Sequence, residues 1–135
     1  LIMSLGVFGQ MYPGRRQVRQ GNREYDKENY VEAEADYMGA LSRNPASYEA
    51  NFNLGNSYFK QSRVEEAELR FQELAQVPYI MNMEQWAQTN YNLGNTQVVQ
   101  YKNTYNREKL TQALESYKQS LRLNPNDREA KFNLA

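Results

Sequence analysis

Asparagine recurs at two fixed positions of a repeated pattern, and its side-chain amide is the group in this chain best suited to recognise a ligand. The two positions lie three residues apart, and they hold Asn53, Asn92 and Asn133 and, three residues later, Asn22, Asn56 and Asn95. Residues three apart lie on the same face of a helix. An amide offers both a donor and an acceptor, which suits binding to the backbone of an extended peptide of any sequence. We therefore predict a row of amides on one helix face that binds an extended peptide.

A structural role is the alternative for the same amides: they could cap or bridge neighbouring helices, and some could do both. Asparagine is a mediocre helix former, so helix propensity does not explain six of them at two positions. In the first repeat Arg19 takes the place of the asparagine, and Arg15 and Lys60 add positive charge nearby. The predicted peptide-binding residues are therefore Arg19 and the six asparagines.

The composition argues against an enzyme. The chain has 135 residues, with no cysteine and no histidine, which excludes thiol catalysis, Ser-His-Asp chemistry and most zinc sites. Acidic pairs such as Glu65 and Glu66 fit a solvated helix face, and no glycine-rich loop is placed to hold a phosphate. The formal net charge is +0, so nucleic acid is not an expected partner. We predict a noncatalytic protein with no cofactor, no metal and no small-molecule substrate.

The asparagines belong to a repeat of about 34 residues, which is the spacing from Gly21 to Gly55. A glycine, an alanine, an aromatic residue, a further small residue and a proline recur in order; in the first repeat these are Gly21, Ala33, Tyr37, Ala40 and Pro45. In the second repeat Leu74 replaces the further small residue. This order resembles the tetratricopeptide repeat (TPR) over residues 14–135. The resemblance implies an all-α fold, a right-handed α-solenoid with about three repeats and the start of a fourth. It also implies that the first helices line a concave groove for a partner protein or peptide.

Prolines and capping residues set the expected boundaries. We predict repeats at 14–47, 48–78 and 82–125 and a partial repeat at 126–135, with helices at 15–27, 30–43, 48–61 and 64–76. Ser47 stands at an N-cap position, and Asn82 with Gln85 fits a capping box. Within the first two hairpins, Gly21 is expected to face Ala33, and Gly55 to face Ala67.

The third repeat departs from this pattern. The spacing from Gly55 to Gly94 exceeds the spacing from Gly21 to Gly55 by five positions, and the spacing from Gly94 to Ala113 exceeds that from Gly55 to Ala67 by seven. We expect a longer first helix and a loop that protrudes near 103–106. Insertions in repeat proteins often lie near a binding face, and the alternative is a tolerant surface loop without function.

Residues 1–9 are apolar and uncharged, and we predict a tail at 1–11 and a TPR domain at 12–135. Such a stretch is too short to span a bilayer, which needs about 20 residues. It resembles the end of a secretory signal, and a tail outside the fold is the alternative. Residues 17–25 and 53–57 resemble more narrowly the TPR proteins of the Bat aerotolerance operons of Bacteroides-type bacteria, an envelope-associated family. This implies the periplasm or cell envelope and a membrane-associated partner complex, with the cytoplasm as the alternative.

Two further features bear on the partner. Some TPR domains hold a C-terminal carboxylate with asparagines and cations, but here Gln88 and Asn92 stand where the cations are expected, so we expect no such clamp. We expect Phe132 and Leu134 to belong to a helix without a partner, which fits either a longer array or self-association. The predicted function is a scaffold that binds an extended peptide or partner protein. The alternative is a structural module that self-assembles through its terminal repeat.

Overall fold

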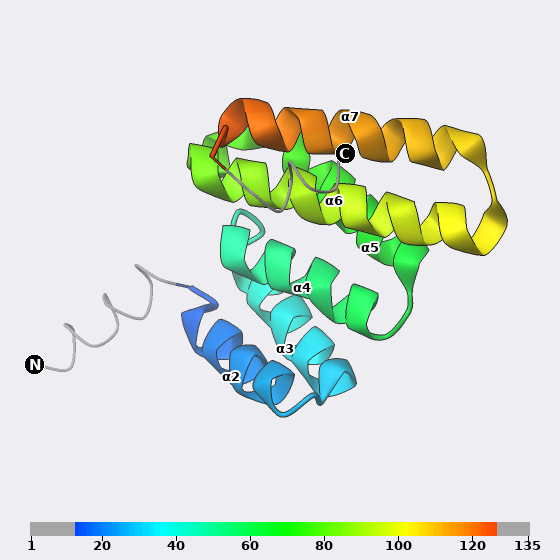
Figure 1. The fold of residues 1–135 in the computed structure, drawn as a ribbon. Helices are drawn as coiled ribbons and strands as arrows, with labels where there is room; N and C mark the ends of the chain where they lie inside the picture. Colours follow the sequence, from blue (N-terminus) through cyan, green and yellow to red (C-terminus); the bar gives the residue numbers. More distant parts are fainter. Residues whose placement is uncertain (1–12, 127–135) are drawn as a thin grey trace, which may run out of the picture.

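The computed structural model describes residues 13–126, which form three α-helical hairpins stacked one on the next (Figure 1). Within this range there is no strand, and the helices are α2 (Arg15–Asp26), α3 (Tyr30–Arg43), α4 (Tyr48–Lys60), α5 (Val64–Ala75), the short 3-10 helix η1 (Pro78–Ile80), α6 (Met83–Thr104) and α7 (Arg107–Leu123). Each hairpin packs on the next through α3 against α4 and through α5 against α6. The predicted all-α solenoid is confirmed.

The helices of the first two repeats begin and end within one residue of their predicted bounds, and side-chain caps fix the starts of α4 and α6. At the start of α4, Ser47 Oγ accepts a hydrogen bond from the backbone N–H of Ala50 at 3.2 Å. At the start of α6, Asn82 and Gln85 form the predicted capping box, with reciprocal bonds of 2.8 and 3.0 Å. The predicted tail at 1–11, and the fourth repeat from Asp127 onward, lie outside the described residues.

In each hairpin a glycine of the first helix packs against an aromatic ring of the second. A Cβ atom added to Gly21, Gly55 and Gly94 would lie 2.6, 2.6 and 2.5 Å from the ring Cε1 of Tyr37, Phe71 and Tyr117, respectively. Carbon atoms pack at about 3.5–4.0 Å, so a side chain does not fit there without movement of the ring. The need for a small residue is confirmed. The prediction that the alanine of the second helix faces the glycine is wrong. The aromatic ring faces the glycine instead, and it follows that alanine by one helical turn.

The third hairpin is longer than the other two, and no loop protrudes from it. Helix α6 continues for ten residues beyond Gly94, α7 begins six residues before Ala113, and only Tyr105 and Asn106 join them. The longer first helix is confirmed and the protruding loop is wrong. The inserted residues instead extend both helices, which keeps their backbone groups hydrogen-bonded. Seven residues make about two helical turns, so the sides of α6 and α7 that face each other stay in register. Asn106 then caps α7 by accepting from the N–H of Glu108 at 3.0 Å.

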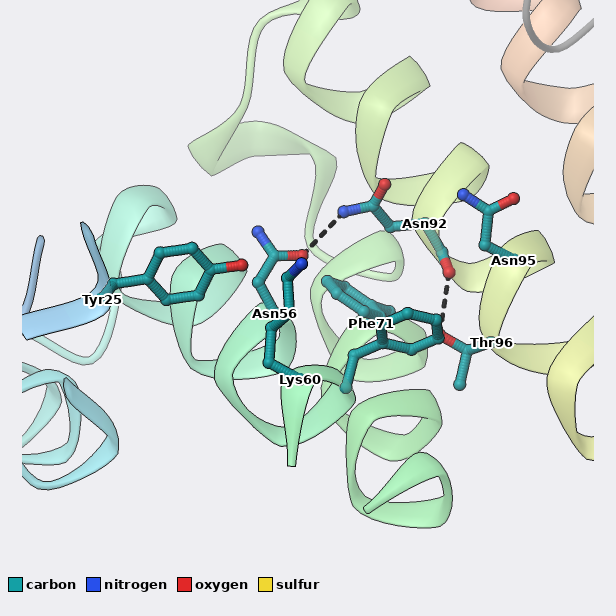
Figure 2. Close-up of a pocket in the computed structure, with 8 residues that line it drawn as sticks. Tyr25, Asn56, Lys60, Phe71, Asn92, Asn95 and Thr96 are labelled. Carbon is teal, nitrogen blue, oxygen red and sulfur yellow. Dashed lines mark hydrogen bonds between the residues drawn. The ribbon is translucent and has the colours of Figure 1, made fainter. Parts of the chain in front are cut away.

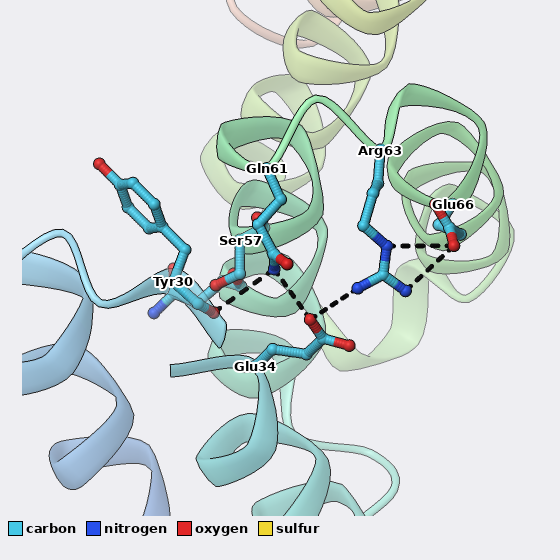
Figure 3. A network of polar contacts seen from close by, with 7 residues as sticks. Tyr30, Glu34, Ser57, Gln61, Arg63 and Glu66 are labelled. Carbon is cyan, nitrogen blue, oxygen red and sulfur yellow. Dashed lines mark hydrogen bonds and ion pairs between the residues drawn. The ribbon is translucent and has the colours of Figure 1, made fainter. Parts of the chain in front are cut away.

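An ion pair at a repeated position joins the second helices of successive hairpins. Glu34 on α3 pairs with Arg63 at the start of α5, and Glu68 on α5 pairs with Lys109 on α7, both at 2.8 Å. Figure 3 shows the first pair, where Gln61 also donates to Glu34 at 2.8 Å. Each glutamate follows the buried alanine of its own helix by one residue, and each cation precedes the next such alanine by four.

We predict opposite effects of the same substitution at two helical glycines. Gly55→Ala is expected to destabilise the protein by about 1–3 kcal/mol, because the new methyl group would overlap the buried ring of Phe71. Gly39→Ala is expected to stabilise it by up to about 1 kcal/mol, because alanine is the better helix former and its Cβ would meet only Gln17 Cγ at 3.8 Å. Urea unfolding measures both changes. Effects of the same sign would show that the ring contact is not the cause.

Candidate peptide-binding groove

The predicted asparagines meet in pairs across neighbouring first helices. Asn53 Nδ2 on α4 donates to Asn22 Oδ1 on α2 at 3.0 Å, and Asn92 Nδ2 on α6 donates to Asn56 Oδ1 on α4 at 2.8 Å. The two sequence positions therefore build one inter-repeat contact that is used twice. All four residues are half-buried, so the amide row bridges the repeats and also reaches the surface.

Tyrosine hydroxyls from the second helices orient two of these amides. Tyr37 Oη donates to Asn22 Oδ1 and Tyr117 Oη donates to Asn95 Oδ1, both at 2.7 Å. An amide whose oxygen accepts such bonds presents its nitrogen in the other direction. The nitrogen of Asn22, for example, donates to Glu49 Oε1 at 3.0 Å. The amide oxygens of Asn22, Asn56 and Asn95 are thus occupied inside the fold. The nitrogens of Asn22, Asn53 and Asn92 also donate within the fold, whereas that of Asn56 forms no hydrogen bond with any residue in 13–126.

A hollow of about 180 Å³ opens between the second and third repeats, and amides form part of its rim (Figure 2). Its walls are contributed by Tyr25, Asn56, Phe59, Lys60, Phe71, Asn92, Asn95 and Thr96. Three of the predicted groove residues therefore come together at one cavity. Sequence reasoning did not find its aromatic base. The signal for it was the phenylalanine that stands at position 71, where the other two repeats have tyrosine.

The remaining predicted residues do not line this hollow. Asn22 on α2 and Asn53 on α4 form the amide pair between the first and second repeats, and Asn133 lies outside the described residues. Arg19 is exposed on α2, and it is not among the residues that form an ion pair within 13–126. Lys60, expected as a groove charge, does line the rim.

The positions where a carboxylate clamp would need cations hold a neutral pair. Gln88 Nε2 donates to Asn92 Oδ1 at 3.2 Å. Among residues 13–126, no three acidic side chains gather into a candidate metal site. No helix in that part of the chain combines the length and the apolar character needed to cross a membrane.

Stacked helix pairs whose contacts run from each repeat to the next define the class of α-solenoid repeat proteins. Within that class, the family model described as tetratricopeptide repeat matches residues 18–79. Residues 18–79 therefore match the tetratricopeptide repeat family. No curated protein sequence matches it significantly. The narrower resemblance to the TPR proteins of Bat operons gains no support from these comparisons and stays a prediction.

Solved structures share this fold over nearly the whole chain. The second TPR domain of human RPAP3, in complex with the HSP70 peptide SGPTIEEVD, is 18% identical with a TM-score of 0.77, covering 93% of this chain and 95% of that one. The first TPR of Spaghetti (RPAP3), bound to the HSP90 peptide SRMEEVD, is 20% identical with a TM-score of 0.75, covering 90% and 87%. The N-terminal domain of stress-induced protein-1 from C. elegans is 17% identical with a TM-score of 0.75, covering 90% and 91%. At these identities the likeness concerns the fold.

Tyr37, the tyrosine that donates to Asn22, makes the free energy of unfolding sensitive to pH in the alkaline range. Burial, the largest cause, raises the pKa of the Tyr37 phenol well above its ordinary value, and burial also raises the pKa of Tyr48 to about 12. An unfolded tyrosine ionises near pH ~10. Each phenol therefore makes its full contribution to the free energy of unfolding below about pH 10. This contribution is lost as the pH rises toward the pKa that the phenol has in the folded protein.

We expect the free energy of unfolding to fall above about pH 10, and to fall less steeply in Tyr37→Phe. At neutral pH the same variant should lose about 1 kcal/mol, because it lacks the hydrogen bond to Asn22. Urea unfolding of wild type and variant at a series of pH values measures both effects. Identical alkaline slopes would contradict the assignment to Tyr37.

Proposed function

We propose that the protein is a noncatalytic scaffold that binds an extended peptide or a segment of a partner protein along its first helices. The observation that carries this proposal is the hollow of about 180 Å³ at the amide row. An extended peptide presents a carbonyl oxygen at every residue, and side-chain amide nitrogens can donate to such oxygens whatever the peptide's side chains. Aromatic rings in the hollow offer an apolar surface to one of those side chains.

Proteins of the same fold support a peptide as the class of ligand, because two of the similar structures hold HSP70 and HSP90 peptides. Those particular peptides are not carried over to this chain. A terminal carboxylate needs charged or multiple donors when it leaves water, and the neutral pair of Gln88 and Asn92 supplies no cation. The proposal is therefore a peptide-binding scaffold that is not a carboxylate clamp.

A charge reversal at the rim tests this function. Peptides selected from a random library on the immobilised chain are expected to bind Lys60→Glu about fivefold more weakly or worse, because a carboxylate there repels peptide carbonyl oxygens; this corresponds to roughly 1 kcal/mol. Lys118→Glu, an exposed change on α7, is the matched control and should bind as wild type does. Titration calorimetry measures both affinities. Equal binding by all three proteins would reject the groove as the working surface.

We further propose that the scaffold works in a membrane-associated complex at the bacterial envelope, in an aerotolerance or stress response. Support comes from the apolar residues 1–9 and from the resemblance of residues 17–25 to Bat-operon TPR proteins. Fractionation of the source cells, followed by immunodetection of the chain, is expected to find it in the envelope or periplasm. Its recovery with cytoplasmic proteins alone would reject this placement.

Self-assembly through the C-terminal end is a second candidate, and one observation favours it. Leu114 takes the position on α7 that Glu34 and Glu68 take on the preceding second helices. Leu114 is 41% exposed, and Leu110, one turn earlier on the helix, is 45% exposed. This face of α7 therefore offers apolar contacts where the earlier repeats offer an ion pair, and exposed apolar patches mark interaction surfaces.

Leu114→Glu tests this candidate, because it restores the glutamate of the other repeats and places a charge in the apolar face. We expect wild type to self-associate with rising concentration and the variant to remain monomeric. Sedimentation equilibrium measures the mass of both, and Leu69→Glu, which changes an exposed leucine of α5, serves as the control. A wild-type chain that is monomeric at every accessible concentration would exclude self-assembly.

A further inference from the structure

The hollow lies where the second repeat lacks an oxygen atom that the other two repeats have. Tyr37 and Tyr117 each donate a hydroxyl to the amide oxygen of the residue after the hairpin glycine, at 2.7 Å. Phe71 occupies the corresponding position, and its ring lies against Gly55 as those tyrosine rings lie against Gly21 and Gly94. With the ring in the same place and no hydroxyl, the amide of Asn56 loses this contact, and the phenylalanine ring forms an apolar wall of the hollow.

Most polar atoms at this hollow are already bonded inside the fold. Thr96 Oγ1 donates to the backbone oxygen of Asn92 at 2.8 Å, and Asn92 Nδ2 donates to Asn56 Oδ1 at 2.8 Å. Tyr117 donates to Asn95 Oδ1. The nitrogen of Asn56 is different, because it forms no hydrogen bond with any residue in 13–126. The hollow therefore combines an apolar interior with one amide donor that awaits an acceptor.

The size and the walls of the hollow fit one aliphatic side chain. An apolar cavity of ~150 Å³ holds a molecule the size of benzene, and this hollow measures about 180 Å³. Its walls include the rings of Tyr25, Phe59 and Phe71. Lys60 adds its aliphatic stem, since lysine buries its methylenes and keeps its ammonium group in water. A leucine, isoleucine or methionine side chain matches this space better than a charged or small one.

We propose that the hollow seats one aliphatic side chain from the interior of an extended peptide, while Asn56 Nδ2 donates to a backbone carbonyl oxygen of the same peptide. This inference rests on the proposed peptide-binding function and names the feature that the site selects. The interior of a peptide, and not its terminus, is the fitting ligand for two reasons. The hollow draws residues from α2, α4, α5 and α6, so the path of a peptide continues on both sides. Lys60 is the single cation among its lining residues, and Gln88 and Asn92 form a neutral pair where a clamp needs further cations.

The experiment selects binders to the 135-residue chain from a library of acetylated and amidated peptides. The selected peptides are expected to share an aliphatic residue. Replacing that residue by alanine should weaken binding to wild type by about tenfold, the effect of burying one such side chain. Calorimetric titration of each peptide pair gives the ratio.

Two variants separate the hollow from the rest of the groove. Phe71→Tyr introduces the residue that the other repeats use, so it should fold as wild type does, shown by an unchanged melting profile. Its hydroxyl occupies the hollow, and the tenfold preference for the aliphatic peptide should disappear. Asn56→Asp keeps the oxygen that accepts from Asn92 and removes the free nitrogen donor, so it should weaken the blocked peptides about fivefold. Tyr37→Phe, the reverse exchange in the first repeat, is the matched control and should keep the preference.

Each outcome bears on one level of the proposal. If no peptide binds to wild type, the proposed function fails and this inference fails with it. If peptides bind, but Phe71→Tyr and Asn56→Asp bind them as wild type does, the groove function stands and the hollow is not the selecting site. A strong preference for peptides with a free C-terminal carboxylate over blocked ones would overturn the assignment to an internal segment.

Discussion

Each hairpin depends on the contact between a glycine of its first helix and an aromatic ring of its second. The helices approach so closely at Gly21, Gly55 and Gly94 that a methyl group would overlap the ring. This approach leaves the rings of Tyr37, Phe71 and Tyr117 almost completely buried and holds their tips beside the amides of the first helices. Because two of those tips carry hydroxyls that bond to groove amides, packing inside each hairpin decides which atoms the groove displays.

Polar contacts align one repeat with the next. Amide pairs join successive first helices, and glutamate–cation pairs join successive second helices. Polar groups that leave water without a partner destabilise the fold, so these contacts favour one register between repeats over its neighbours. On α7 the series changes, because Leu114 stands where the earlier helices have glutamate. The face of α7 that carries Leu114 therefore suits an apolar neighbour, whereas the interfaces between the earlier second helices suit pairs of charged side chains.

The binding surface follows from a small difference between otherwise equivalent repeats. All three place an aromatic ring at the same position against the glycine, but only the second leaves out the hydroxyl. The same packing that closes the hairpin thus leaves an apolar hollow in the middle of the array, beside an amide whose nitrogen has no partner among the described residues. Selectivity can arise in this way from one side-chain atom while the scaffold is unchanged, since the ring needs no hydroxyl to pack.

The sequence by itself determined the helix pairs, their order and most of their ends, because these depend on local signals: the recurring glycine and alanine positions of each repeat, the capping groups at Ser47 and Asn82, and the helix-ending prolines. It also indicated which asparagines share a helix face. Only the tertiary structure decided what they contact, because Asn53 and Asn22 belong to different repeats and meet only when those repeats stack. The seven extra residues of the third repeat are a similar case. Their number is plain in the sequence, but loop and helix both satisfy local preferences there, and packing of α6 against α5 and α7 favours the helix.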